Sequence, residues 1–189
     1  MRLSRIYVNV SNLQLFNKVT FHLLKLLISP SSKSQISHEF LTEHSEDLIF
    51  NISKTPSQLI VITGGEPLMH NLDELTAALQ SAGLKTNIET SGSHPLTGSW
   101  DWVCLSPKKF KAPLPTVIPF ANELKVVIFN NSDFEWAEKY AAQVNTECKL
   151  YLQPEWDKAP IVTPVIIEYI KAHPQWQLSL QIHKYINVP

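Results

Sequence analysis

From residue 59 onward, hydrophobic and polar positions follow the pattern of alternating strands and helices. The continuous apolar run at 59–62 predicts a short strand that is buried on both faces. Leucines at helical spacing then predict a helix over 67–82, which Gly83 ends. Further strands are predicted at 85–89, 102–105, 124–129, 149–152 and 177–182, with helices at 134–144 and 163–171.

This alternation, with short connections, predicts an α/β fold with parallel strands and right-handed crossovers. The number of strand–helix units favours an incomplete (β/α) barrel, and a doubly wound open sheet is the second possibility.

Residues 1–58 differ from the rest of the chain. They contain no glycine and have a serine-rich middle, whereas all five glycines lie after residue 63. We therefore expect an atypical N-terminal segment at 1–58 and a partial barrel at 59–189. One interpretation of the first segment is an irregular cap with a helix near 19–28. The other is that it has replaced the native partner of the barrel.

Composition excludes several classes of function. Sixteen Lys and Arg against 17 Asp and Glu give a net charge of −1, which argues against a nucleic-acid-binding protein. No apolar run approaches the roughly 18 residues that span a bilayer, and no signal peptide is recognisable, so a cytoplasmic location is expected. The two cysteines, Cys104 and Cys148, exclude a disulfide-rich scaffold and any site that needs three thiolates from this chain.

Polar residues follow the carboxyl ends of five predicted strands, where ligands bind in both candidate architectures. These strand ends lie at 63–67, 89–92, 106–108, 153–155 and 183–185. Their convergence predicts one ligand pocket.

The same blocks carry a resemblance to a known family. The Gly-Gly-Glu-Pro element at 64–67 resembles the S-adenosylmethionine-binding strand of radical SAM enzymes. With the blocks at 89–92, 100–108, 123–126, 152–156 and 178–185, residues 58–189 resemble 7-carboxy-7-deazaguanine synthase, the queuosine-pathway family.

The resemblance implies a radical SAM lyase. Members of the family convert 6-carboxy-5,6,7,8-tetrahydropterin to 7-carboxy-7-deazaguanine with loss of ammonia. They use S-adenosylmethionine, a [4Fe-4S] cluster and Mg²⁺, and they are typically homodimers. A small-molecule pterin substrate, and neither nucleic acid nor membrane, is therefore the expected partner.

The resemblance also implies roles for individual residues. Cofactor binding is expected from Gly64, Gly65, Ser91, Ser106, Pro107, Lys108, Gln153, Pro154, Glu155 and Trp156. Substrate contacts are expected from Thr63 and from Pro189, whose free carboxylate is a hydrogen-bond acceptor. No catalytic residue and no metal ligand is expected from this chain.

Simpler structural roles remain open for some of these positions. Thr63 and Ser91 carry hydroxyls that can satisfy turn backbone, and Lys108 belongs to a run of solvated lysines. Glu66 is expected mainly to cap a helix, and Cys104 to be a small buried hydrophobic residue.

The chain departs from the family in one respect. Radical SAM enzymes hold their cluster with Cys-x-x-x-Cys-x-x-Cys before the Gly-Gly-Glu-Pro strand, but no cysteine precedes Cys104 here, and the Mg²⁺ ligand has no counterpart. Three hypotheses follow. The chain is an inactive family member whose start is altered or lost, a non-catalytic paralogue that binds S-adenosylmethionine or a pterin, or a structural or partner-binding module.

Overall fold

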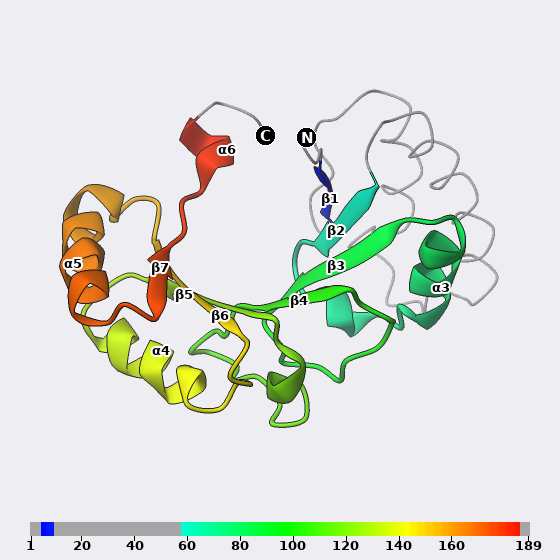
Figure 1. Ribbon diagram of the computed structural model, residues 1–189, viewed down its shortest axis with the longest axis horizontal. Helices are drawn as coiled ribbons and strands as arrows, with labels where there is room; N and C mark the ends of the chain where they lie inside the picture. The colour runs from blue at the N-terminus through cyan, green and yellow to red at the C-terminus, as the bar shows by residue number, and fades with distance from the viewer. Residues whose placement is uncertain (1–4, 10–57, 186–189) are drawn as a thin grey trace. The chain divides into compact units, whose positions relative to one another are not determined.

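The computed structural model describes residues 5–9 and 58–185, which belong to two compact units (Figure 1). Unit 1 comprises residues up to Glu89 together with Leu96–Trp102, and unit 2 comprises Thr90–Pro95 and the residues from Val103 onward. The helix predicted near 19–28 lies outside the described residues, and the division expected at residue 58 stays a prediction.

Unit 1 is built on three parallel strands that pair in chain order: β1 (Arg5–Asn9), β2 (Leu59–Thr63) and β3 (Lys85–Thr90). A single 3₁₀ turn, η1 (Pro67–Met69), and the helix α3 (Asp73–Ser81) connect β2 to β3. The three central residues of β2 are buried, as predicted for a strand covered on both faces. Strand β1, which lies in the N-terminal segment, was not predicted.

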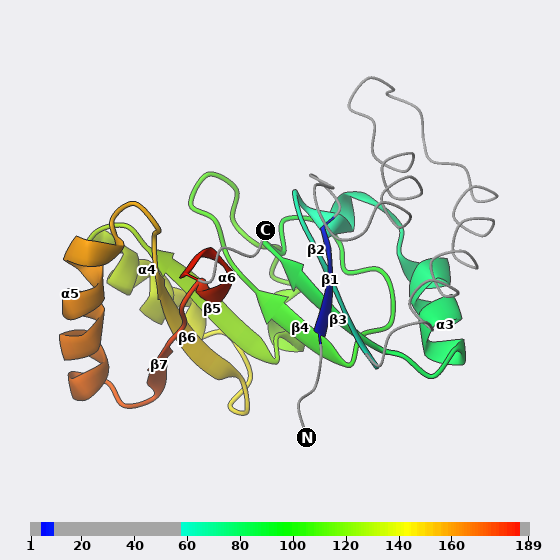
Figure 2. The same cartoon turned by 90° about the horizontal axis from the view of Figure 1, so that it is seen from above.

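Unit 2 also holds parallel strands in chain order: β4 (Trp102–Leu105, entering the unit at Val103), β5 (Glu123–Ile128), β6 (Lys149–Pro154) and β7 (Trp176–Leu178). Its helical segments are η2 (Ile118–Phe120), α4 (Ser132–Ala141), α5 (Ala159–Ala172) and the short α6 (Ile182–Tyr185). Helices α4 and α5 lie along one face of this sheet (Figures 1 and 2).

The core of unit 2 lies between that face and the helices. Alternate residues of β5, namely Leu124, Val126 and Ile128, are buried there against α4 and α5. Phe134 of α4 and Ile166 of α5 belong to the same cluster. The apolar residues of the strands are thus used in the core, and the polar residues follow at the carboxyl ends of the strands.

The α/β class with parallel strands is confirmed, and the sheet in each unit is open rather than a closed barrel. Helix α5 begins earlier than predicted, because Pro160 fits its first turn and Pro164 is accommodated inside the helix instead of opening it. The strand predicted at 177–182 is wrong beyond Leu178: the N–H of Ile182 donates to the carbonyl of Leu180 in a turn, and α6 follows. No described helix is long and apolar enough to cross a membrane.

Candidate functional site

In unit 1, the carboxyl end of β2 makes a sharp turn. Gly64 has a φ of +103°, a conformation that residues with a side chain rarely adopt. Glu66 then caps η1, with its Oε1 accepting from the N–H of Leu68 at 3.1 Å, so the predicted capping role is confirmed. Thr63 is half-buried at the end of the strand. The turn at Gly64 therefore favours a glycine for its backbone conformation, and the Glu66 side chain is used by the fold.

In unit 2, hydrogen bonds join the loop after β3 to the end of β4. The N–H of Ser106 donates to the carbonyl of Thr90 at 2.7 Å, and Lys108 Nζ donates to Ser106 Oγ at 3.1 Å. The Ser91 hydroxyl donates to Ser93 Oγ at 3.0 Å. The Ser106 hydroxyl and the Lys108 ammonium therefore lie together at the end of β4, beside the loop that carries Ser91, and such groups suit a carboxylate ligand.

The end of β6 forms the second part of the site in unit 2. Gln153 and Pro154 are buried, and the N–H of Glu155 donates to the carbonyl of Ile128 at 2.9 Å. The Glu155 carboxylate accepts from the N–H of Lys158 at 3.0 Å, which shapes the turn into α5. Glu155 thus has a structural role, and Trp156 is left half-buried beside the turn.

The segment after β7 contacts the chain before this turn, at Leu152, and within it, at Trp156. The N–H of Ser179 donates to the carbonyl of Leu152 at 2.9 Å. Further along, the Tyr185 ring meets the Trp156 ring edge-on with centroids 5.0 Å apart, and Lys184 Nζ lies 4.9 Å from the Trp156 centroid. The C-terminal segment therefore packs against the turn that is predicted to bind adenosine.

The predicted site residues are thus distributed as follows. Unit 2 brings Ser91 close to Ser106–Lys108 through Thr90, and it joins the turn 153–156 to the C-terminal segment. Thr63, Gly64 and Gly65 belong to unit 1. Pro189 lies outside the described residues, and all ligand contacts of these positions remain predictions.

Two neighbours of the site were missed by sequence reasoning. Ser93 is buried and bonded to Ser91, and Ser179 Oγ donates to Gln153 Oε1 at 3.4 Å. A serine after a strand carries no pattern that separates a site residue from an ordinary turn residue. Only the hydrogen bonds reveal them.

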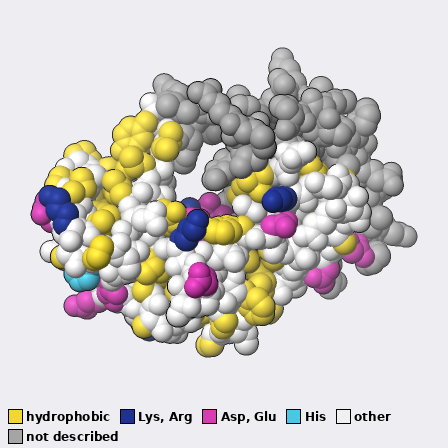
Figure 3. Space-filling view, in the orientation of Figure 1, with side chains coloured by type: hydrophobic (Ala, Val, Ile, Leu, Met, Phe, Trp, Pro, Cys, Tyr) yellow, Lys and Arg dark blue, Asp and Glu magenta, His cyan; other side chains and the backbone are white. Residues whose placement is uncertain are grey.

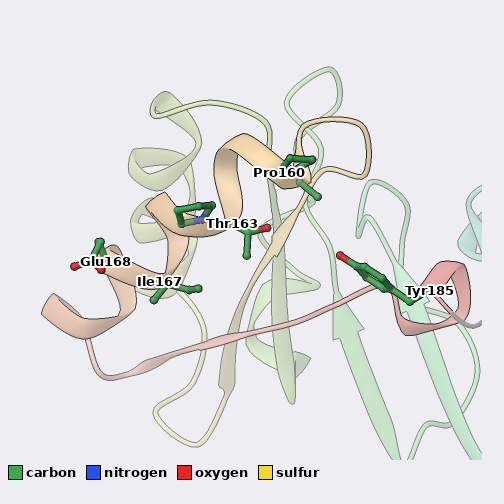
Figure 4. Close-up of a pocket in the computed structure, with 7 residues that line it drawn as sticks. Pro160, Thr163, Ile167, Glu168 and Tyr185 are labelled. Carbon is green, nitrogen blue, oxygen red and sulfur yellow. The ribbon is translucent and has the colours of Figure 1, made fainter.

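A cavity of about 520 Å³ lies between α5 and α6 of unit 2. Pro160, Thr163, Ile167 and Glu168 line it from α5, and Tyr185 lines it from α6 (Figure 4). Exposed hydrophobic side chains also lie over α5 in the space-filling view (Figure 3). None of the predicted cofactor-binding residues lines this cavity.

The two cysteines do not suit an iron–sulfur cluster. Both are free and buried, and burial raises the pKa of Cys148 to about 11, which keeps it a thiol at neutral pH. Cys104 Sγ donates to the Glu123 carboxylate at 3.4 Å. Thiolates are the ligands that clusters need, and this chain has no third cysteine. Within residues 58–185, no group of three His, Cys, Asp or Glu lies where it could hold a metal ion.

Comparison with known proteins connects this geometry to one family. The chain is 48% identical over 143 residues to the 7-carboxy-7-deazaguanine synthase of Flavobacterium psychrophilum, covering 76% of this chain and 68% of the relative. The Synechocystis enzyme of the same name is 49% identical over 137 residues, which are 72% of this chain and 65% of the relative.

This chain belongs to the 7-carboxy-7-deazaguanine synthase family. Among solved structures, the crystal structure of QueE from Escherichia coli matches with a TM-score of 0.64 and 34% identity, over 72% of this chain and 63% of that one. The chain therefore spans about two thirds of the length of such relatives. No protein-family model matches it.

Proposed function

We propose that this chain is a 7-carboxy-7-deazaguanine synthase relative that retains the ligand-binding strand ends but does not catalyse the reaction. The proposal rests on one combination of features. Hydrogen bonds in unit 2 join the loop after β3 to Ser106 and Lys108, yet the chain has only two cysteines, both of them buried. When bound in the family, S-adenosylmethionine supplies an adenosyl radical, but only with a cluster that the residues of this chain do not fit.

The residues of unit 2 suit the two ends of S-adenosylmethionine. Ser91, Ser106 and Lys108 offer hydroxyl and ammonium donors for its methionyl carboxylate. The buried Gln153 and the Trp156 ring offer an amide and an aromatic face for its adenosine. Gly64 and Gly65 of unit 1 have no side chain, and we propose that their backbone approaches the methionyl amino group.

For the substrate side, we propose a pterin such as 6-carboxy-5,6,7,8-tetrahydropterin, contacted by Thr63 and the Pro189 carboxylate. The proposed place of the protein is queuosine biosynthesis, in the cytoplasm, as a homodimer. Light scattering of the purified chain tests the assembly, since a monomer at all concentrations contradicts it.

The test of the proposed function is calorimetry with S-adenosylhomocysteine, which keeps the carboxylate and the adenosine of the cofactor and is unreactive. We expect binding, and we expect Lys108→Ala to weaken it about tenfold, because a charge-assisted hydrogen bond is lost. Lys139→Ala is the matched control, since Lys139 lies on α4 among aromatic rings and should leave the affinity unchanged. Absence of binding by the unmodified chain contradicts the proposal.

A further inference from the structure

Helix α5 carries apolar side chains on its outer side as well as on its buried side. Val162 and Ile166 belong to the core of unit 2, whereas Ile161, Val165 and Ile167 are exposed over 70%, 42% and 41% of their surface. The first nine residues of the helix, 159–167, include no charged residue. A helix that is apolar on all sides is buried on all sides in most proteins, so the outer face of α5 calls for a partner.

The outer face carries a stripe that has opposite charges at its two ends. The stripe consists of Lys158, Ile161, Val165 and Glu168, which are three, four and three residues apart and therefore share one side of the helix. The positive charge precedes the first turn and the negative charge lies toward the C-terminal end. The helix dipole favours the reverse order, so the stability of the helix itself does not explain this placement.

The stripe is symmetric about Thr163. Ile161 and Val165 lie two residues before and after it, and Lys158 and Glu168 lie five residues before and after it. Two copies of α5 that pack antiparallel about a two-fold axis near Thr163 therefore set Ile161 against Val165, and Lys158 against Glu168, each pair occurring twice. The charges at the ends of the stripe are then complementary between the copies.

The surface beside the stripe has the shape and the size that such a pairing needs. Pro160, Thr163 and Pro164 line the cavity of about 520 Å³ from α5, with Tyr185 on its α6 side (Figure 4). The ridge of one helix packs into the groove beside the ridge of another, and this cavity supplies the groove. The exposed apolar surface of the outer face and of Tyr185 comes to roughly 500 Å² per copy, or about 1,000 Å² in a pair, which reaches the lower bound of a specific interface.

We propose that the outer face of α5 is the surface on which two copies of this chain associate, with their α5 helices antiparallel about Thr163. This pairing supplies the surface of the proposed homodimer, so it rests on that part of the proposed function and not on ligand binding. Within one chain, the Glu168 carboxylate accepts from Lys171 Nζ at 2.7 Å and its side chain is 72% exposed. A carboxylate accepts from more than one donor, so Lys158 of the second copy can join this pair.

Sedimentation equilibrium of the full chain over a range of micromolar concentrations measures the dimer dissociation constant. Ile161→Asp places a charge in the apolar centre of both copies and should raise this constant at least about 100-fold. Because Ile161 is exposed in the single chain, the variant should fold normally. Phe120→Asp is the matched control, since Phe120 is 60% exposed on η2 and should leave the dissociation constant unchanged.

A charge swap tests the antiparallel pairing itself. Lys158→Glu sets like charges against each other across the interface and should raise the dissociation constant about tenfold. Adding Glu168→Lys restores opposite charges and should return the constant to within about threefold of the unmodified chain. A negative charge before the first turn favours the helix, so weaker association of Lys158→Glu does not come from unfolding.

The outcomes separate this surface from the rest of the proposed function. A dimer that is equally tight in Ile161→Asp uses another surface, which overturns the α5 pairing and leaves the homodimer standing. If the second charge change does not restore association, the antiparallel pairing is wrong. If Ile161→Asp instead unfolds the chain, the outer face is covered within one chain and the pairing is also wrong. A monomer at all concentrations overturns both the pairing and the homodimer, while calorimetry with S-adenosylhomocysteine still decides ligand binding.

Discussion

Gly92 lies in a tightly packed turn of the candidate site, directly after Ser91. Its φ is +71°, and a Cβ there would lie 2.6 Å from Leu105 Cδ1 and 3.0 Å from Pro113 Cβ. Its carbonyl also accepts from the N–H of Leu114 at 2.8 Å. The absence of a side chain at this residue therefore lets the Ser91 loop pack against the end of β4.

Replacing Gly92 should be costly for stability. We expect Gly92→Ala to lower the free energy of unfolding by about 2–4 kcal/mol, from the left-handed backbone and from overpacking. Gly83→Ala is the matched control, because Gly83 has a φ of +78° but open space around it, and about 1 kcal/mol is expected. Urea denaturation followed by tryptophan fluorescence measures both. Equal losses in the two variants would show that the packing of Gly92 contributes nothing.

At the same scale, sequence reasoning predicted some residues well. Cys104 was expected to be buried on a strand and Glu66 to cap a helix, and both are found so. Burial and capping follow from local pattern, so one sequence suffices. The hydrogen bond between Ser179 and Gln153 has no local signature, because it depends on which groups tertiary packing brings together.

The turn between β5 and α4 shows how one side chain organises an element. Asp133 is buried, and its Oδ2 accepts from the N–H groups of Phe129 at 2.7 Å and Asn130 at 2.8 Å. Lys109 pairs with its other oxygen at 2.5 Å. Burial raises the pKa of Asp133, but Lys109 and the two N–H groups outweigh it, so the pKa lies below the ordinary 3.8.

This lowered pKa sets the sign of a pH effect. In acid the unfolded chain binds a proton on Asp133 before the folded chain does, so the stabilisation is present above pH 3.8 and is lost as the pH falls through the lowered pKa. We expect Asp133→Asn to cost about 1–3 kcal/mol near neutral pH and less in acid. Urea titrations at about pH 6 and about pH 3 measure the difference.

The control for this prediction is Glu135→Gln, an exposed acidic residue in the same first turn of α4. It should change stability little at either pH. A loss in Asp133→Asn that does not shrink in acid would contradict the role of the charge.

Elements with a strong pattern were predictable, and the others were not. The β-branched run of β5 and the buried run of β2 gave the right strands. The end of β7 was wrong, because the alternation of 177–182 continues past the point where a turn at Leu180 breaks the strand. Helix α4 was also misplaced at its start: it begins at Ser132, two residues before the predicted 134, and the Asp133 carboxylate binds the preceding turn.

For the whole molecule, the class of fold and the strand ends that carry the site could be predicted from the sequence. Parallel strands must present their carboxyl ends at one edge, so polar residues after strands were expected to gather within a sheet. Unit 2 does this with Ser91, Ser106 and Lys108. How the C-terminal segment meets Trp156 could not be predicted, because the aromatic contact joins positions with no periodic relation.

The measurement that tests the central claim most directly is the iron and sulfide content of the purified chain after anaerobic reconstitution and desalting. Because one chain offers only two buried thiols, we predict no stable cluster and far less than one equivalent of iron retained. Retention of about four iron and four sulfide per chain, as a [4Fe-4S] cluster requires, would contradict the account.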